Sequence, residues 1–397
     1  MFTNHPIAVV MFVAVLAPLL GMTRAGRRVP VAVLEVVLGV VIGPHVLALV
    51  EFDSFLSSMK FVGTGALLFM AGMEIDFAQI RGRPLALASA GWIGSLLLAL
   101  VAVGVLHVIP GVHAPMMVAL ALTTTGLGVL LPILRDGGQL ETQLGRMVMA
   151  AGTVGEIAPI VAVSLVLSEK YSGWQSFGFL LAFLALVVVV GVVGVTARHP
   201  RLLDLLSRAM HSSTQLPVRL ALFVMFVLLV ISEEFGFEGI FGAFAAGMVV
   251  GVATRDEASK PFREKIDAIC FGWFTPFFFI GTGIQYNLGA LVHSFAGLFS
   301  MFSFLVLFLL VRGLPVLLYR REISKAERLP FALSSSVASL GLVVVISQIG
   351  LRERSMSADI AQALVGAALL SLLVYPTLMR VLLSRSAQRT AKEADTR

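Results

Sequence analysis

The sequence is poor in the residues on which soluble catalysts and secreted domains depend. It contains a single cysteine, Cys270, so no disulfide can form within the chain. Only 13% of the 397 residues are charged, whereas 58% are hydrophobic. No phosphate-binding loop, nucleophile motif or metal-ligand cluster stands out, and no cofactor is implied. These absences exclude a soluble enzyme and indicate a chain surrounded largely by lipid.

Apolar runs of about twenty residues recur along the whole chain, as expected of an all-α polytopic membrane protein. The basic residues are scattered through short loops between these runs, which argues against nucleic-acid binding. If the N-terminus is outside, most of the 29 lysines and arginines fall on the inner side. We therefore predict a plasma-membrane protein with a cytosolic C-terminus. The pattern predicts thirteen spans, roughly at 7–22, 30–50, 59–77, 85–109, 113–134, 146–168, 176–197, 216–234, 237–253, 268–285, 292–318, 329–350 and 358–384.

The thirteen spans divide as six, one and six around a long basic loop at 197–216. Because a single span separates the two sets, the second set starts on the opposite side of the membrane, which predicts inverted repeats. The fifth span then pairs with the twelfth, and both contain hydroxyl-rich stretches with glycine that predict interrupted helices at a transport site. The alternative is that these small residues only allow close helix packing. The stretches contain Thr123, Thr124, Thr125 and Gly126 in one span, and Ser334, Ser335, Ser336 and Gly341 in the other.

Glu156 is the residue that points most directly to function. It lies about ten residues into an apolar span, where a carboxylate costs at least a few kcal/mol and by default marks an ion or proton path. Arg312 is the only clear base inside a span, and it lies at similar depth. We expect Glu156 to carry either a cation or a proton, and Arg312 to form an ion pair with it when no cation is bound. The alternatives are a permanent ion pair that only fixes packing, or an arginine that reaches the inner surface.

Other charged residues receive structural interpretations. Glu35 would pair with a basic loop residue or shape an entrance. Glu74 and Asp76 would form a solvated cluster at an inner span end, and Lys60 is counted with the outer loops.

Five ordered blocks resemble the monovalent cation:proton antiporter-2 family, which includes bacterial sodium/proton exchangers and glutathione-gated potassium efflux systems. The blocks are 29–46, 67–76, 123–156, 242–247 and 276–283. The resemblance implies a homodimer-forming panel of spans within 7–77 and 216–285, a moving core of spans within 85–168 and 292–384, and a linker helix at 176–197. It also implies that the interrupted helices cross at the site, and that Glu156 and Arg312 are the family's acid and base.

The expected activity is exchange of a monovalent cation, sodium or potassium, for protons by alternating access. Thr124, Thr125 and Ser335 are the expected cation ligands beside Glu156. Many relatives have an aspartate preceded by Asp, Asn or Gln, whereas here Gly155 precedes a glutamate, and the base is arginine rather than lysine. Because arginine stays charged, we expect electroneutral exchange of one proton for one cation.

Two alternatives remain at this stage. One is proton-coupled export of an organic ion or antibiotic on the same scaffold, and the other is a channel or sensor that does not exchange ions. The transmembrane region is expected to extend over 1–384. The tail at 385–397 is expected to be cytosolic and is too short to fold into the nucleotide-binding region that some relatives carry.

Overall fold

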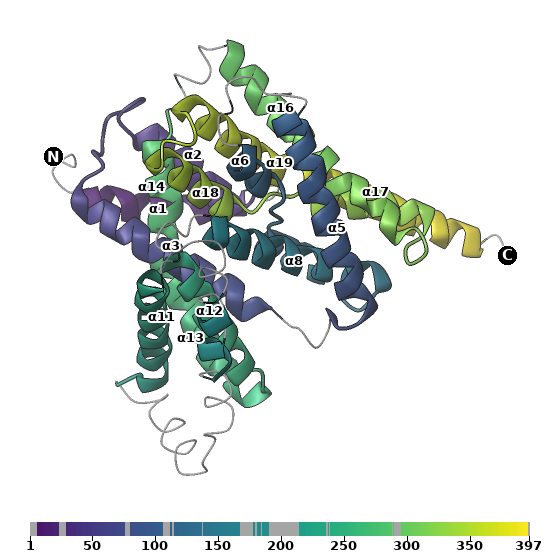
Figure 1. Cartoon of the computed structure of the whole chain (residues 1–397), viewed down its shortest axis with the longest axis horizontal. Helices are drawn as coiled ribbons and strands as arrows, with labels where there is room; N and C mark the ends of the chain where they lie inside the picture. The colour runs from purple at the N-terminus through teal and green to yellow at the C-terminus, as the bar shows by residue number, and fades with distance from the viewer. Residues whose placement is uncertain are drawn as a thin grey trace.

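The computed structural model describes residues 6–23, 29–75, 80–105, 115–136, 138–166, 214–235, 239–287 and 295–395, with a few residues between these ranges. Every regular element in these residues is helical (Figure 1). Seven helices in the described part are long and apolar enough to cross a membrane, and a bent pair of shorter helices makes up to eight. The chain is therefore an all-α polytopic membrane protein, as predicted. The predicted seventh span, 176–197, lies largely outside the described residues.

One group of helices, here called the first helix group, joins the N-terminal region to residues 214–287 and lies at the left and bottom of Figure 1. α2 packs against α1 and α14, and α3 packs against α12 and α14. Glycines allow these close contacts, because a Cβ atom on Gly39 or Gly283 would collide with a backbone carbonyl of the opposite helix. The group consists of α1 (Pro6–Met22), α2 (Val31–Ile42), α3 (Ser54–Glu74), α11 (Leu216–Glu234), α12 (Gly239–Ala253), α13 (Lys260–Ile269), η4 (Cys270–Phe274) and α14 (Thr275–Gln285).

Most of the second helix group lies at the centre and right of Figure 1, whereas α18 lies left of centre in this view. In this group α5 packs against α8, α16 against α19, and α17 against both α8 and α19. The group consists of α5 (Arg83–Leu100), η2 (Val101–Val105), α6 (Pro115–Leu122), α7 (Leu127–Asp136), α8 (Gln143–Val166), α16 (Phe295–Gly313), η5 (Leu314–Tyr319), α17 (Lys325–Ser335), α18 (Leu340–Arg352) and α19 (Ala358–Asp395).

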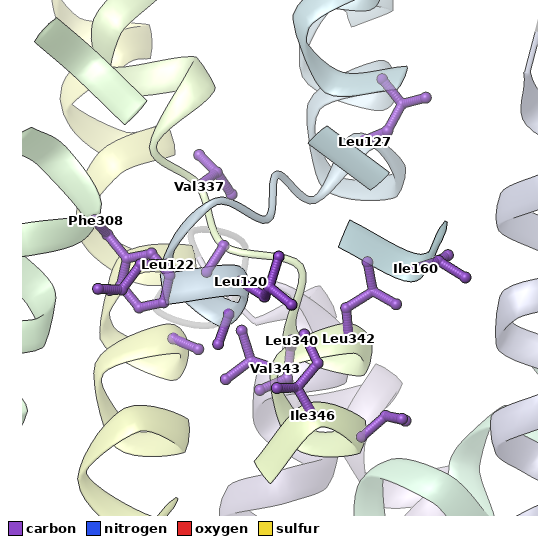
Figure 2. Close-up of a cluster of buried hydrophobic side chains, with 14 of the residues drawn as sticks. Leu120, Leu122, Leu127, Ile160, Phe308, Val337, Leu340, Leu342, Val343 and Ile346 are labelled. Atoms are coloured by element: carbon purple, nitrogen blue, oxygen red, sulfur yellow. The ribbon is translucent and has the colours of Figure 1, made fainter. Parts of the chain in front are cut away.

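Two membrane helices are interrupted at the hydroxyl-rich stretches. The chain leaves helical form between α6 and α7, and again between α17 and α18, whose axes are bent by 43°. The two non-helical segments touch, since the Gly126 N–H donates to the Val337 carbonyl at 2.8 Å. A Cβ atom on Gly126 would lie 2.9 Å from the Ala338 carbonyl oxygen. Figure 2 shows both segments, with buried side chains such as Leu120 and Phe308 packed around them.

The hydroxyl groups at the two breaks add hydrogen bonds to carbonyls in the last turns of the ending helices. Thr123 and Thr124 donate to the carbonyls of Leu120 and Ala121, each at 2.8 Å. Ser334 and Ser336 donate in the same way to Phe331 and Ala332 at 2.7 Å. Under-satisfied polar groups are costly where water is excluded, so these additional hydrogen bonds help a helix to stop inside the membrane.

Candidate functional site

Glu156 lies near the middle of α8 and is 5% exposed. Its Oε1 atom accepts a hydrogen bond of 3.0 Å from the Leu127 N–H, which belongs to the first residue of α7. Its Oε2 atom is buried and has no hydrogen-bond partner among the described residues. A helix N-terminus attracts negative charge, so the interrupted helix itself holds one oxygen of the carboxylate and leaves the other oxygen to bind a ligand.

Arg312 lies at the end of α16 and is 4% exposed. Its Nε atom donates to Thr125 Oγ1 at 2.9 Å and more weakly to the Ser335 carbonyl at 3.4 Å. The Nη atoms donate to the Ala151 carbonyl at 3.0 Å and to Ser95 Oγ at 3.4 Å. All four acceptors are neutral, and the expected ion pair with Glu156 is absent from this structure.

The ends of the interrupted helices explain why no direct ion pair is needed. The C-terminal end of a helix carries partial negative charge and the N-terminal end partial positive charge. The guanidinium group of Arg312 lies beside Ser335, the last residue of α17, and beside Thr125, which follows the end of α6. Glu156 lies at the start of α7. Each buried charge is therefore partly compensated by helix ends of opposite sign.

Gly155 has no side chain because its neighbours occupy that space. A Cβ atom there would lie 2.7 Å from Arg312 Nη2 and equally close to Thr125 Oγ1. The Gly155 carbonyl also accepts a hydrogen bond of 3.0 Å from the Thr125 N–H. Many relatives have an Asp, Asn or Gln side chain at the position before the acid. Here that position is glycine, and Arg312 fills the space that such a side chain would occupy.

A cavity of about 300 Å³ lies between the two helix groups, and Glu156 lines it. The second group also contributes Gly126 and Ser339, and the first group contributes Glu35 and Glu74. Glu35 is only 6% exposed. We call this space the carboxylate cavity. Glu35 and Glu74, which the sequence suggested to be structural or solvated, therefore face the same space as Glu156.

Three expected ligands lie elsewhere. Thr124, Thr125 and Ser335 do not line the carboxylate cavity. The Thr125 hydroxyl donates to the Ser335 carbonyl at 2.7 Å and accepts from Arg312, so the structure gathers both residues around the guanidinium group. Ser335 Oγ is buried without a hydrogen-bond partner among the described residues. A direct role for these hydroxyls as cation ligands stays a prediction.

Several groups at the site carry no signal in the sequence. The Leu127 N–H and the Ala151 carbonyl act through the backbone, which a side-chain motif cannot reveal. Ser371 of α19 accepts a 3.0 Å hydrogen bond from the Ala338 N–H, so another helix stabilises the non-helical segment between α17 and α18. Glu35, by contrast, is the only acid in the apolar stretch of α2, which is the same signal that identified Glu156.

The family model of the transmembrane sodium/hydrogen exchangers matches residues 11–385. The chain belongs to this family. This confirms the resemblance to cation:proton antiporters, and the family is one of transporters rather than enzymes.

Named relatives and a solved structure agree with the family. The exchanger-family chain is 26% identical to YjbQ of Bacillus subtilis (strain 168), whose name assigns it to the Na(+)/H(+) antiporters, over 98% of this chain and 65% of that protein. It is 24% identical to the Na(+)/H(+)-K(+) antiporter GerN of Bacillus cereus, over 87% of this chain and 88% of GerN. The structure of the sodium proton antiporter MjNhaP1 from Methanocaldococcus jannaschii matches with a TM-score of 0.67 and 18% identity, covering 96% of this chain and 99% of the other. That match supports the fold.

Proposed function

We propose that this exchanger-family protein moves a monovalent cation across the membrane in exchange for protons, with Glu156 as the binding group for both ions. The observation that carries the proposal is the buried Oε2 atom of Glu156, which lacks a hydrogen-bond partner in a carboxylate that lines a cavity. The names of YjbQ and GerN point to sodium, and that of GerN also to potassium, as the cation.

The exchange follows from the cost of a bare charge. A carboxylate in a low-dielectric site is unfavourable unless an opposite charge or a proton neutralises it. The guanidinium group of Arg312 is engaged with neutral acceptors, so it does not neutralise Glu156 by direct contact. Binding of a cation and binding of a proton then exclude each other. One carboxylate that takes either ion, beside an arginine that keeps its charge, gives electroneutral exchange.

The cation is expected to bind to the oxygens of Glu156 on the side of the carboxylate cavity. Ser339 lines the same cavity and offers a hydroxyl oxygen. Thr124, Thr125 and Ser335 are expected to act mainly through the breaks and through Arg312, whose hydrogen bonds fix the geometry around the carboxylate.

The larger architecture extends the same proposal. The first helix group would be the panel and the second helix group the moving core, since contacts are dense within each group. Thirteen spans would form six-plus-six inverted repeats around a linker at 176–197, with α6–α7 and α17–α18 as equivalent interrupted helices. Movement of the core would carry Glu156 from one side of the membrane to the other. A homodimer in the plasma membrane, with an outer N-terminus and the tail at 385–397 in the cytosol, completes the proposal.

Purified protein in liposomes tests this function. A proton-sensitive dye reports pH changes when sodium, potassium, lithium or rubidium is added, and Glu156→Gln is compared with the wild type. Glu264→Gln, an exposed acid on α13, serves as the matched control. Cation-dependent proton movement that is lost in Glu156→Gln and kept in Glu264→Gln supports the proposal.

Two results would oppose it. No response to any of the four cations, with folded protein, would favour an organic cargo or a channel. Exchange that survives in Glu156→Gln would assign the carrier role to another residue.

A further inference from the structure

Lys60 lies inside a helix rather than in the loop to which its sequence position assigned it. It belongs to α3 and is only 6% exposed. Its ammonium group donates a hydrogen bond to Gln285 Oε1 and lies 5.7 Å from the centre of the Phe52 ring. No carboxylate in the described part of the chain lies within ion-pair distance of it. A lysine charge held by an amide and a ring is expensive to bury, so its retention calls for an explanation.

Lys60 faces a second cavity, of about 490 Å³, between the two helix groups. We call it the lysine cavity. Gln285 and Gln348 also line it, as does Arg352. The side chain of Arg352 is mostly exposed and pairs with Glu353 at 3.4 Å, which leaves Lys60 as the buried charge of this cavity among the described residues.

The two cavities are arranged along the same helices. α3 lines the carboxylate cavity through Leu67, Ala71 and Glu74, and it lines the lysine cavity through Lys60 and Thr64. α18 does the same: its first residues line the carboxylate cavity and its last residues line the lysine cavity. The two cavities therefore follow one another along both helices, and the boundary between them falls between Thr64 and Leu67 on α3 and between Gly341 and Val345 on α18.

Leu67 lies next to that boundary, on the side of the carboxylate cavity. A Cβ atom on Gly341 would lie 2.6 Å from Leu67 Cδ2, so the leucine packs against the start of α18 beside the second break. Leu67 comes seven residues after Lys60 and seven before Glu74. Residues at this spacing lie on one stripe of a helix, with a rise of about 10 Å for each step. Along α3 the stripe thus carries a positive charge, an apolar contact and a negative charge.

We propose that Lys60 makes cation binding to Glu156 weaker on the side of the lysine cavity than on the side of the carboxylate cavity. This inference rests on the proposed function, because it requires Glu156 to reach both cavities in turn. On one side Glu35 and Glu74 attract a cation toward the carboxylate. On the other side the Lys60 ammonium group repels it, so that ion release into the lysine cavity is easier and loading from it is harder.

The size of the effect follows from the geometry of α3. Glu156 and Leu67 line the same cavity, so the charge of Lys60 acts on Glu156 over at least about 10 Å, and at an effective dielectric constant of about 20 this changes cation affinity by at most roughly ten-fold. At a pH high enough to ionise Glu156 before the cation binds, Lys60→Gln should therefore lower the KM for the cation by up to about ten-fold from the lysine-cavity side and leave the KM unchanged from the other side. Lys60→Arg keeps the charge and should behave like the wild type.

The test uses right-side-out and inside-out membrane vesicles that hold the full-length protein, with cation-dependent proton movement measured at each face. Ser57→Cys, labelled with a membrane-impermeant maleimide, identifies the face on which the lysine cavity opens, since Ser57 lines that cavity and the native Cys270 is buried. A one-sided fall in KM for Lys60→Gln, absent in Lys60→Arg, supports the inference.

A change of KM on both faces, on neither face, or equally in Lys60→Arg overturns the inference while wild-type exchange leaves the proposed function intact. If Lys60→Gln does not fold, Gln285→Glu places a carboxylate against the same ammonium group and should produce the same one-sided fall. An unchanged KM in that variant also overturns the inference. Wild-type vesicles without any cation-dependent proton movement would overturn the proposed function and the inference with it.

Discussion

Replacement of Gly155 by alanine tests how closely the carboxylate helix and the arginine depend on each other. The new Cβ atom would lie 2.7 Å from both Arg312 Nη2 and Thr125 Oγ1, closer than real Cβ atoms approach other atoms. The guanidinium group must then move, and its 3.0 Å hydrogen bond to the Ala151 carbonyl is the contact most directly affected.

The magnitude follows from three opposing contributions. Overpacking a filled site costs about 1–3 kcal/mol, and a hydrogen bond from a charged donor contributes about 1.5–3 kcal/mol. Alanine in place of glycine within a helix stabilises the folded state by about 1 kcal/mol. The net destabilisation of Gly155→Ala is therefore about 1.5–5 kcal/mol, which for a chain of 397 residues corresponds to a fall in Tm of roughly 2–6 °C.

The assay is thermal unfolding in detergent, followed by the amount of protein that stays monodisperse after heating. Gly94→Ala in α5 is the matched control, because a Cβ atom there meets nothing within 4 Å. We expect Gly94→Ala to keep or slightly raise the wild-type Tm. If Gly155→Ala melts at the same temperature as Gly94→Ala, a side chain at position 155 does not disturb the packing of Arg312 against α8, and the reasoning is refuted.

Two further substitutions test the packing of each helix group. Arg312→Lys keeps the charge, but a lysine cannot reach four acceptors at once. We therefore expect a loss of about 2–4 kcal/mol in stability and slower cation-dependent proton movement in liposomes. Wild-type stability and rate in this variant would contradict the assigned contacts. Gly283→Ala places a Cβ atom against a backbone carbonyl of α2 and should lower stability by at least about 2 kcal/mol, whereas Gly272→Ala, with open space in the same span, should not. Equal melting temperatures for these two variants would show that the contact between α2 and α14 is not tight.

The sequence predicted the helical class, the two breaks and the two charged residues buried within helices, because each depends on local composition. Long apolar runs determine the spans, and the threonines before Gly126 supply the hydroxyls that a broken helix needs. Glu156 and Arg312 were identified because ionisable groups are rare in such runs.

The direct pairing of Glu156 with Arg312 is not formed in this structure, and Arg312 as the charge partner of Glu156 stays a prediction. The sequence places both residues at one depth but does not say which way the broken helices present their ends. Here the end of α17 and the Thr125 hydroxyl take the guanidinium group, and the start of α7 takes the carboxylate. Attraction by helix ends replaced attraction between the two side chains.

The cavity charges were missed for a different reason. Glu35, Glu74 and Lys60 belong to helices of the first group, and their importance depends on which face of each helix meets the second group. That arrangement comes from contacts between segments far apart in the sequence. Lys60 and Glu74 nevertheless lie fourteen residues apart on α3, and a charge near each end of one span was a readable signal.

The central claim is that one carboxylate binds either a proton or a cation, and the most direct measurement is proton release on cation binding. Purified protein in weakly buffered detergent solution is titrated with sodium or potassium while the pH and the heat of cation binding are recorded. Because a carboxylate must lose its proton to bind the cation, we predict release of about one proton for each cation bound and no release from Glu156→Gln. Cation binding without proton release in the wild type, or the same release in Glu156→Gln, would contradict the account.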